Sequence, residues 1–152
     1  MDTTTLHLSH WAEAMTADCG RAQSEIVLSA LSLLPPRTST AGEWPALWEA
    51  LKAACKKKVK VEIYLPKPNA INPATKANYT TAAAAEAAGM ICRLLPGPRL
   101  LHCKSMVIDR QIVWIGSGNF TAAAAHFNHE AYTRSVRADF ACAMLERWKA
   151  LS

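Results

Sequence analysis

Residues 101–119 read Leu-His-Cys-Lys-Ser-Met-Val-Ile-Asp-Arg-Gln-Ile-Val-Trp-Ile-Gly-Ser-Gly-Asn, and they are the most informative stretch of the chain. Two apolar runs, at 106–108 and 112–115, flank the polar segment 109–111. Apolar runs that are separated by a short polar connection are typical of a β-hairpin. We therefore predict an antiparallel hairpin in this stretch.

Polar side chains mark the two open ends of the predicted hairpin. His102 and Lys104 stand on the way in, and Ser117 and Asn119 follow Gly116 on the way out. An antiparallel pair of strands brings these ends together. An imidazole, an ammonium, a hydroxyl and an amide would then converge on one spot, and this set of groups suits a phosphate ester.

The segments around the hairpin alternate between helical and strand patterns. Strands joined by crossover helices imply a largely parallel sheet that is covered on both faces. We predict an α/β fold with a mixed, mostly parallel β-sheet flanked by helices on both faces, in a single domain of residues 1–152. The predicted helices span 8–21, 44–55, 74–88, 120–126 and 138–151, and the other predicted strands span 24–31, 59–65, 90–95 and 129–136.

Two helix starts carry capping signals. Residues 40–43, Thr-Ala-Gly-Glu, have the spacing of a capping box. Asn72 before Pro73 is typical of an N-cap followed by the first helical residue.

Composition is that of an ordinary globular protein with a basic excess. The 152 residues are 51% hydrophobic and 19% charged, with a formal net charge of +5 and a pI of about 9.1. A basic excess favours anionic partners such as nucleic acid, phospholipid head groups or nucleotides, without choosing among them.

The cysteines and the N-terminal residues bear on the compartment. Five cysteines are scattered without a C-x-x-C pair, which is typical of reduced thiols in a cytosolic protein. The first residues lack the basic region and the long apolar run of a signal peptide. No segment approaches the length of a membrane span. We expect a cytoplasmic protein that does not enter a membrane.

The spacing of the polar residues resembles a known signature. The stretch contains the complete pattern H-x-K-x4-D-x6-G-S-x-N of the phospholipase D superfamily. The α/β order and the length resemble the small, single-domain bacterial endonucleases of that superfamily. An acidic residue is common in the family on the strand after the short helix, and Glu130 stands there. The signature residues are His102, Lys104, Asp109, Gly116, Ser117 and Asn119.

The chemistry of the signature follows from its groups. A neutral His102 imidazole can attack phosphorus and form a phosphohistidine, which splits one difficult displacement into two easier ones. Lys104 binds the non-bridging oxygens as a positive charge. Ser117 and Asn119 offer hydrogen bonds to the same oxygens. Asn119 is also predicted to stand at the start of a helix, whose free backbone N–H groups would add to the phosphate site.

The two acidic residues receive different roles. Glu130 has the right chemistry to accept the other ring N–H of His102 and so to orient it. The alternative for Glu130 is an ion pair with Arg134, which shares its strand face. Asp109 has odd parity relative to His102, so we predict a structural role, either tying down the turn or pairing with a base such as Arg110.

The resemblance also implies an acid for the leaving group, supplied by a second histidine of a second signature. This chain has one copy, so either two chains pair through this face or the site is incomplete. We expect the first, a homodimer with the active site at its interface and His102 of the second copy as the acid. The scheme requires no metal and no other cofactor.

Other candidate features have simpler interpretations. The pairs His7-x-x-His10 and His126-x-x-His129 lack an acidic or cysteine partner at matching spacing, so we interpret them as surface or capping histidines, with His129 nearest the site.

The stretch 56–60 is either a phosphate-contacting stripe or a solvated helix end. Trp44 and Trp48 are predicted to be core residues rather than a base-stacking platform.

The sequence therefore predicts a metal-independent phosphodiesterase, a non-specific endonuclease that cleaves nucleic acid, with DNA as the first expected substrate and RNA as the second. A phospholipase D or phosphatidyl transferase is the alternative with the same chemistry. A nucleic-acid-binding module that keeps the fold without turnover is the alternative from another class. The sequence shows no apolar membrane-binding helix of the kind that would favour a lipid substrate.

Overall fold

The structure is a computed structural model that describes residues 2–37 and 41–152. It holds one sheet of seven strands in the spatial order β1-β7-β6-β5-β2-β3-β4. The strands are β1 (Thr3–His7), β2 (Glu25–Ser29), β3 (Lys60–Pro66), β4 (Ile91–Leu95), β5 (Lys104–Ile108), β6 (Ile112–Gly116) and β7 (Tyr132–Val136). The helices are α1 (Trp11–Arg21), α2 (Glu43–Lys56), α3 (Asn78–Ala87), α4 (Ala122–His126) and α5 (Ala138–Leu151), with a 3₁₀ turn, η1 (Pro73–Thr75), before α3.

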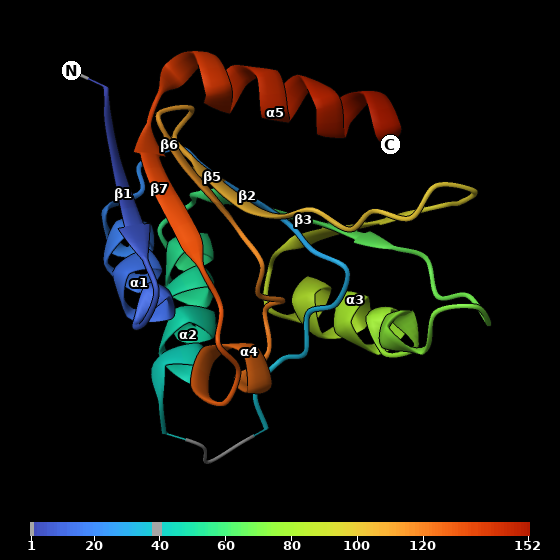
Figure 1. Cartoon of the computed structure of the whole chain (residues 1–152). Helices are drawn as coiled ribbons and strands as arrows, with labels where there is room; N and C mark the ends of the chain where they lie inside the picture. Colours follow the sequence, from blue (N-terminus) through green and yellow to red (C-terminus); the bar gives the residue numbers. More distant parts are fainter. Residues whose placement is uncertain (1, 38–40) are drawn as a thin grey trace.

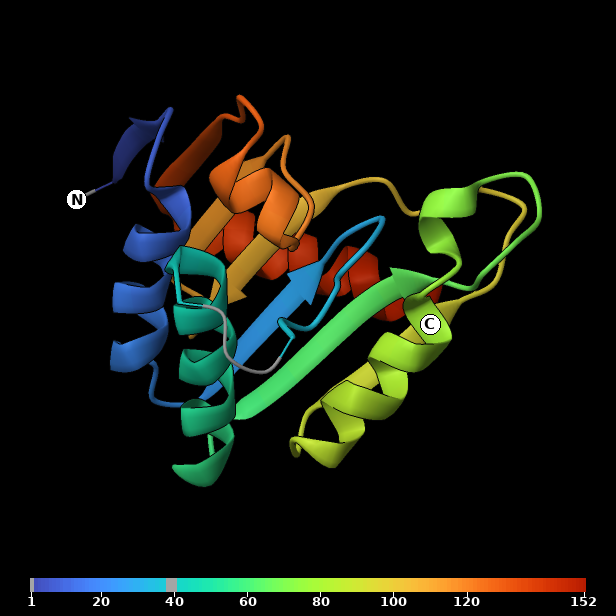
Figure 2. The same cartoon turned by 90° about the horizontal axis from the view of Figure 1, so that it is seen from below.

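Helices lie on both sides of the sheet, as the sequence predicted. α1, α2 and α3 cover one face, with α4 beyond the ends of β6 and β7, and α5 lies alone across the other face (Figure 1). Figure 2 shows the same layers from below, with α5 behind the sheet. No helix in the described ranges is both long and apolar enough to span a bilayer.

The predicted hairpin is formed by β5 and β6. Lys104 pairs with Gly116 at the open end, and Ile108 pairs with Ile112 next to the turn. Asp109 and Arg110 in the turn have φ angles of 52° and 57°. Consecutive left-handed residues give a hairpin turn the twist that matches its strands.

The mixed sheet is confirmed, but it is not mostly parallel. Among the described strands, only β2–β3 and β3–β4 are parallel pairs, whereas β1–β7, β7–β6, β6–β5 and β5–β2 are antiparallel. α2 and α3 cross over a face of the sheet between their strands, which keeps those strands parallel. α4 lies beyond the strand ends instead, so the chain returns beside β6 in the opposite direction (Figure 1).

β1 has no counterpart in the predicted elements. Its sequence, Thr-Thr-Thr-Leu-His, lacks a buried face, and four of its five residues are exposed. The strand forms because its backbone pairs with the free edge of β7, from Thr3 opposite Val136 to His7 opposite Tyr132. Pairing with an existing edge needs no hydrophobic pattern of its own.

The apolar core has one layer on each side of the sheet. The larger layer lies under α1 and α2 and contains Trp44 and Trp48, which confirms that both are core residues. The smaller layer lies under α5, where Leu145 and Trp148 pack on strand residues such as Val107. The sheet thus lies between two apolar layers, which hold its strands in place.

Of the two predicted helix caps, the one at Asn72 is confirmed, and the one at residues 40–43 lies partly outside the described residues. Thr40 lies outside the described residues, and the N-cap position of α2 is Gly42. The Asn72 side chain accepts a hydrogen bond from the Ala74 N–H at 3.1 Å, as predicted for an N-cap. It caps the short turn η1, and α3 itself begins at Asn78, later than expected.

Candidate active site

Strand register gathers the signature at one edge of the sheet. Lys104 at the start of β5 pairs with Gly116 at the end of β6, and Gly116 pairs with Tyr132 at the start of β7. These residues form one row across three strands. His102 precedes this row, Ser117 follows it and Glu130 lies just before it. The chain therefore brings them to one edge of the sheet.

His102 and Lys104 are in direct contact. Lys104 Nζ lies 3.0 Å from His102 Nδ1, within hydrogen-bond distance. Lys104 is only 7% exposed, whereas His102 is exposed. Burial lowers the pKa of Lys104 below its ordinary value, and the charge of Glu130 partly opposes this shift. An exposed imidazole beside a partly desolvated ammonium suits an anionic ligand that approaches from solvent.

Two buried serines support the segment that carries His102. The Oγ atoms of Ser29 on β2 and Ser105 on β5 lie 2.6 Å apart. Ser29 Oγ also donates to the Cys103 carbonyl at 3.2 Å. The sequence does not reveal this pair, because a serine inside an apolar run carries no signal of its tertiary partner.

Gly116 is required by close packing between two strands. A Cβ atom there would lie 2.4 Å from the Ala131 carbonyl oxygen and 2.4 Å from ring atoms of Tyr132. No side chain fits at that distance. The glycine of the signature thus lets β7 approach β6, which places Glu130 beside Ser117.

Glu130 binds the side chains of its own loop and of Ser117. Ser117 Oγ donates to Glu130 Oε2 at 2.5 Å and accepts from the Ala131 N–H at 3.0 Å. Asn128 Nδ2 donates to Glu130 Oε1 at 3.2 Å. Within residues 2–37 and 41–152, the structure thus gives Glu130 these partners and not His102. The Ser117 proton that was predicted to reach phosphate is directed at Glu130 here.

The alternative ion pair between Glu130 and Arg134 is not formed either. Arg134 Nε donates to Asp18 Oδ2 on α1 at 2.7 Å, and Trp114 Nε1 donates to the same oxygen at 2.9 Å. Asp18 is only 2% exposed. Arg134 therefore belongs to a buried hydrogen-bond network with Asp18 and Trp114, and Glu130 pairs with other residues.

Asn119 is fixed by the loop after β2. Its Oδ1 accepts from the Ser32 N–H at 3.2 Å, which leaves the amide NH₂ as the group that can donate to a ligand. Asn119 does not start the helix, contrary to expectation. Thr121 is the N-cap of α4, and its Oγ1 accepts from the Ala124 N–H at 3.2 Å.

Asp109 lies at the opposite end of the hairpin from His102. Its carboxylate accepts hydrogen bonds from the N–H groups of Gln23, Ser24 and Glu25 at 2.8–3.0 Å and from the Ser24 hydroxyl at 2.9 Å. Burial alone would raise the pKa of Asp109, but these bonds lower it below its ordinary value. Arg110, the predicted alternative partner, instead donates to Glu25 at 2.6 Å. Asp109 thus ties the turn to the start of β2.

The basic stretch 56–60 lies far from the signature edge. Lys60 is the first residue of β3, opposite Glu25 at the start of β2, whereas the signature stands at the other end of β2. Lys60 Nζ pairs with Glu62 Oε2 at 2.9 Å. The solvated helix end is thus the better interpretation of this stretch. His129 lines one cavity together with Glu130 and so does lie near the site, as expected.

The fold and the signature edge together define a phospholipase D-like α/β protein. Residues 16–150 match the model of the family described as cardiolipin synthase, PLD-like domain, and the chain belongs to this family. A search of curated proteins found no significant match.

Solved structures share the fold across the whole chain. The phospholipase D family member Nuc from Salmonella typhimurium is 23% identical with a TM-score of 0.77, covering 99% of this chain and 94% of that one. NucT from Helicobacter pylori is 16% identical with a TM-score of 0.76, covering 99% and 96%. A phosphatidylserine synthase from Haemophilus influenzae is 12% identical with a TM-score of 0.72, covering 99% of this chain but 38% of that one.

Proposed function

We propose that this protein is a phosphodiesterase that cleaves nucleic acid through a phosphohistidine on His102. The observation that carries the proposal is the 3.0 Å contact between His102 Nδ1 and Lys104 Nζ at the sheet edge where Ser117, Asn119 and Glu130 also stand. A nucleophile, a cation and hydrogen-bond donors on one edge suit a tetrahedral phosphate and the charge that develops on it.

Substrate binding has to release the imidazole from Lys104. In the structure the ammonium donates to Nδ1, which occupies a lone pair of the ring. A phosphate diester is a stronger partner for the ammonium, because both are charged. We infer that Lys104 turns to the non-bridging oxygens. The released imidazole then changes tautomer by proton exchange with water, so that its Nδ1–H donates a hydrogen bond to Glu130 and its Nε2 lone pair faces phosphorus.

The first step forms a bond between Nε2 and phosphorus and breaks the bond from phosphorus to the leaving oxygen. That oxygen needs a proton, and we propose His102 of a second copy as the donor, in an isologous homodimer. In the second step, the imidazole of the second copy takes a proton from water. The water oxygen attacks phosphorus, and the bond from phosphorus to His102 of the first copy breaks. No metal enters these steps, and Lys104 and Asn119 stabilise the negative charge that develops on the non-bridging oxygens of the phosphate.

Nucleic acid is the favoured substrate. The net charge of +5 suits a polyanion, and the solved structures named Nuc and NucT share the fold at a similar chain length. We propose DNA ahead of RNA, cleavage without sequence specificity, and action in the cytoplasm, where the five free cysteines stay reduced.

One observation favours a second candidate, a phospholipase D or phosphatidyl transferase. A cavity of about 1120 Å³ borders Asn119, and its walls are mainly apolar, with Leu34, Pro35, Trp44 and Phe127 among them. An apolar cavity beside a phosphate site would accept the acyl part of a phospholipid.

Cleavage assays in EDTA test the proposal. Plasmid, single-stranded DNA and phosphatidylcholine vesicles are offered in parallel to the wild type, to His102→Ala and to the control His129→Ala, an exposed histidine outside the signature. We expect cleavage of both DNA substrates, loss in His102→Ala and little change in the control. Cleavage of vesicles alone would favour the second candidate, and DNA binding without cleavage would favour the inactive module.

Trapping the covalent intermediate is the sharper test of mechanism. A labelled diester is mixed with the protein, quenched in alkali and mapped by mass spectrometry. We expect the label on His102. Label on another residue, or cleavage that requires Mg²⁺, would contradict the mechanism.

A further inference from the structure

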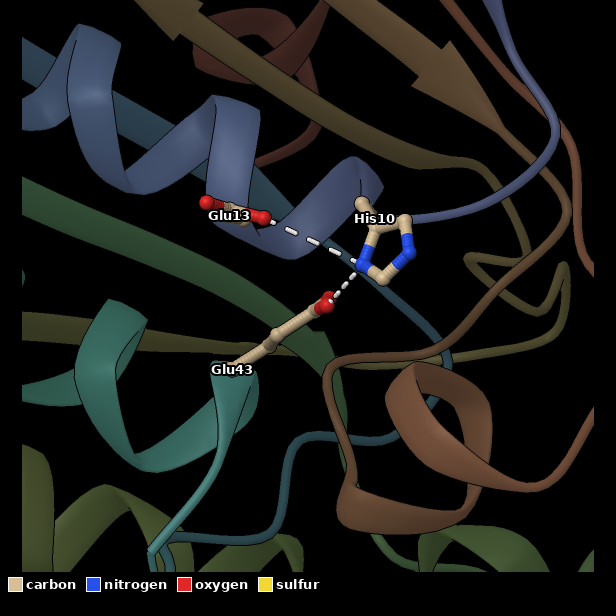
Figure 3. A group of neighbouring side chains, drawn as sticks. All are labelled: His10, Glu13 and Glu43. Carbon is tan, nitrogen blue, oxygen red and sulfur yellow. Dashed lines mark hydrogen bonds and ion pairs between the residues drawn. The ribbon is translucent and has the colours of Figure 1, made fainter.

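A histidine and two glutamates from two helices meet outside the candidate active site (Figure 3). His10 precedes α1, Glu13 lies in its first turn, and Glu43 is the first residue of α2. Nδ1 of His10 contacts Glu43 Oε1 and lies 3.8 Å from Glu13 Oε2. The three possible ligand atoms all lie within 4.8 Å of one another.

This spacing fits one metal ion. A tetrahedral zinc ion with bonds of about 2.0–2.1 Å holds neighbouring ligand atoms about 3.4 Å apart. The His10 and Glu13 side chains are 71% and 75% exposed, so both can rotate by the small amount that is needed. Figure 3 shows both carboxylates directed at the same ring nitrogen of His10.

Helix capping explains the glutamates but not the histidine. Carboxylates in a first helical turn are favoured by the helix dipole, whereas an imidazolium there is not. His10 occupies the N-cap position of α1, yet its side chain makes no capping hydrogen bond. Its backbone is left-handed, with a φ of 52°, which is unfavourable for a residue with a Cβ. In this conformation the His10 ring contacts Glu43 and lies 3.8 Å from Glu13.

The cluster opens on a cavity with room for further ligands. The cavity has a volume of about 330 Å³, and His10, Glu43, His126 and Glu130 are among its lining residues. The His126 ring packs on Gly42, the residue before Glu43, so closely that a Cβ there would lie 2.8 Å from its Cε1. A second imidazole thus stands beside the cluster, on α4.

We propose that His10, Glu13 and Glu43 bind one divalent transition-metal ion of the Zn²⁺ class, with water or His126 as a fourth ligand. A set of one imidazole and two carboxylates suits such an ion, whereas Mg²⁺ prefers oxygen ligands alone. None of these residues belongs to the signature. The ion joins the N-terminal ends of α1 and α2 and stabilises the fold by binding only its folded form. It supplies no nucleophile.

Zinc binding to the chelator-treated protein tests this site. We expect calorimetry to show one ion bound per chain and thermal unfolding to show a higher Tm with Zn²⁺ than with EDTA. Both effects are lost in His10→Ala and Glu43→Gln. They are retained in Glu49→Gln, which changes an exposed glutamate of α2 that pairs with Lys52. Glu13→Gln is the second test variant, because its exposed carboxylate has no other ion-pair partner in the described structure and its loss leaves folding intact.

Cobalt substitution separates this site from the thiols. Because the five cysteines are free, an exposed thiol such as Cys142 could also bind zinc. Bound Co²⁺ is expected to show no near-ultraviolet thiolate charge-transfer band. Absence of zinc binding in the wild type, equal zinc binding in Glu13→Gln and Glu43→Gln, or a strong thiolate band would each overturn the proposal.

Discussion

Asp109 shows how a signature residue can act without meeting the substrate. Its carboxylate holds three consecutive N–H groups at the start of β2, a contact between residues more than 80 positions apart in sequence. A carboxylate that accepts several backbone hydrogen bonds is stabilised in its charged form. Asp109 therefore fixes the register of the hairpin on β2, and with it the position of the distant site edge.

Replacement of Asp109 by asparagine should lower stability. We expect Asp109→Asn to lower the free energy of unfolding by about 1–2 kcal/mol at pH 7, since charge-assisted hydrogen bonds are lost. Because folding lowers the pKa of Asp109, this contribution is full above its ordinary value of 3.8 and fades as the pH falls through the folded value. Urea unfolding of both proteins across that pH range measures the difference.

The control for this variant is Asp2→Asn, which removes an exposed carboxylate that pairs with Arg137. It should change stability little. The folded fraction of Asp109→Asn should keep its activity per molecule. A large fall in kcat with unchanged stability would instead place Asp109 in the chemistry.

Replacement of Lys104 should have the opposite effects to replacement of Asp109: activity is lost and stability is kept. Burial lowers the pKa of Lys104, so the protonated side chain disfavours the folded state at neutral pH. We expect Lys104→Met to leave the Tm unchanged or higher while it abolishes cleavage. The exposed Lys56→Met should alter neither quantity. A marked fall in the Tm of Lys104→Met would show that the buried ammonium stabilises the fold.

At the scale of elements, two helix ends use the same motif with different residues. After α2, the Val59 N–H donates to the Ala54 carbonyl at 3.0 Å and Lys58 has a φ of 66°. After α3, the Met90 N–H donates to the Ala85 carbonyl at 2.9 Å and Gly89 has a φ of 88°. Both are Schellman ends, in which glycine is the favoured left-handed residue.

This comparison predicts opposite effects for two substitutions. Lys58→Gly should raise the free energy of unfolding by roughly 0.5–1 kcal/mol, because it removes a strained left-handed side chain. Gly89→Ala should lower it by about 1 kcal/mol, although its Cβ would meet only Cys55 Cβ at an ordinary 3.6 Å. Thermal unfolding of both variants is the measurement. A loss of stability in Lys58→Gly would show that the Lys58 side chain makes a favourable contribution that exceeds its strain.

At the scale of the whole molecule, one copy of the candidate site holds half of the groups that the proposed mechanism needs. One chain supplies one histidine in the signature, and the two-step mechanism needs a nucleophile and an acid. The proposed homodimer supplies both, and its activity should depend on the composition of mixed dimers.

Mixing wild type with His102→Ala tests this dependence. If both histidines are needed, a fully exchanged equal mixture keeps about a quarter of the activity, the share of dimers with two wild-type copies. If each chain works alone, about half remains. Activity is followed on plasmid after subunit exchange, with sedimentation velocity to show the dimer. A cleaving monomer would contradict the shared site.

The sequence by itself determined the local elements and the spacing of the signature. The hairpin, the helix 138–151 and the core tryptophans followed from periodicity and composition, because side-chain direction repeats at fixed intervals along helices and strands. His102 and Lys104 lie two residues apart, so their contact was also encoded locally.

Only the tertiary structure decided which polar groups pair across the fold. Glu130 with Ser117, Arg134 with Asp18, and His10 with Glu43 join segments whose approach depends on strand order and helix packing. The antiparallel return of β7 and the pairing of β1 were likewise settled by a free sheet edge. Hydrogen bonds and ion pairs are short-ranged and carry no periodic pattern, so their partners are fixed only when the packed backbone brings them together.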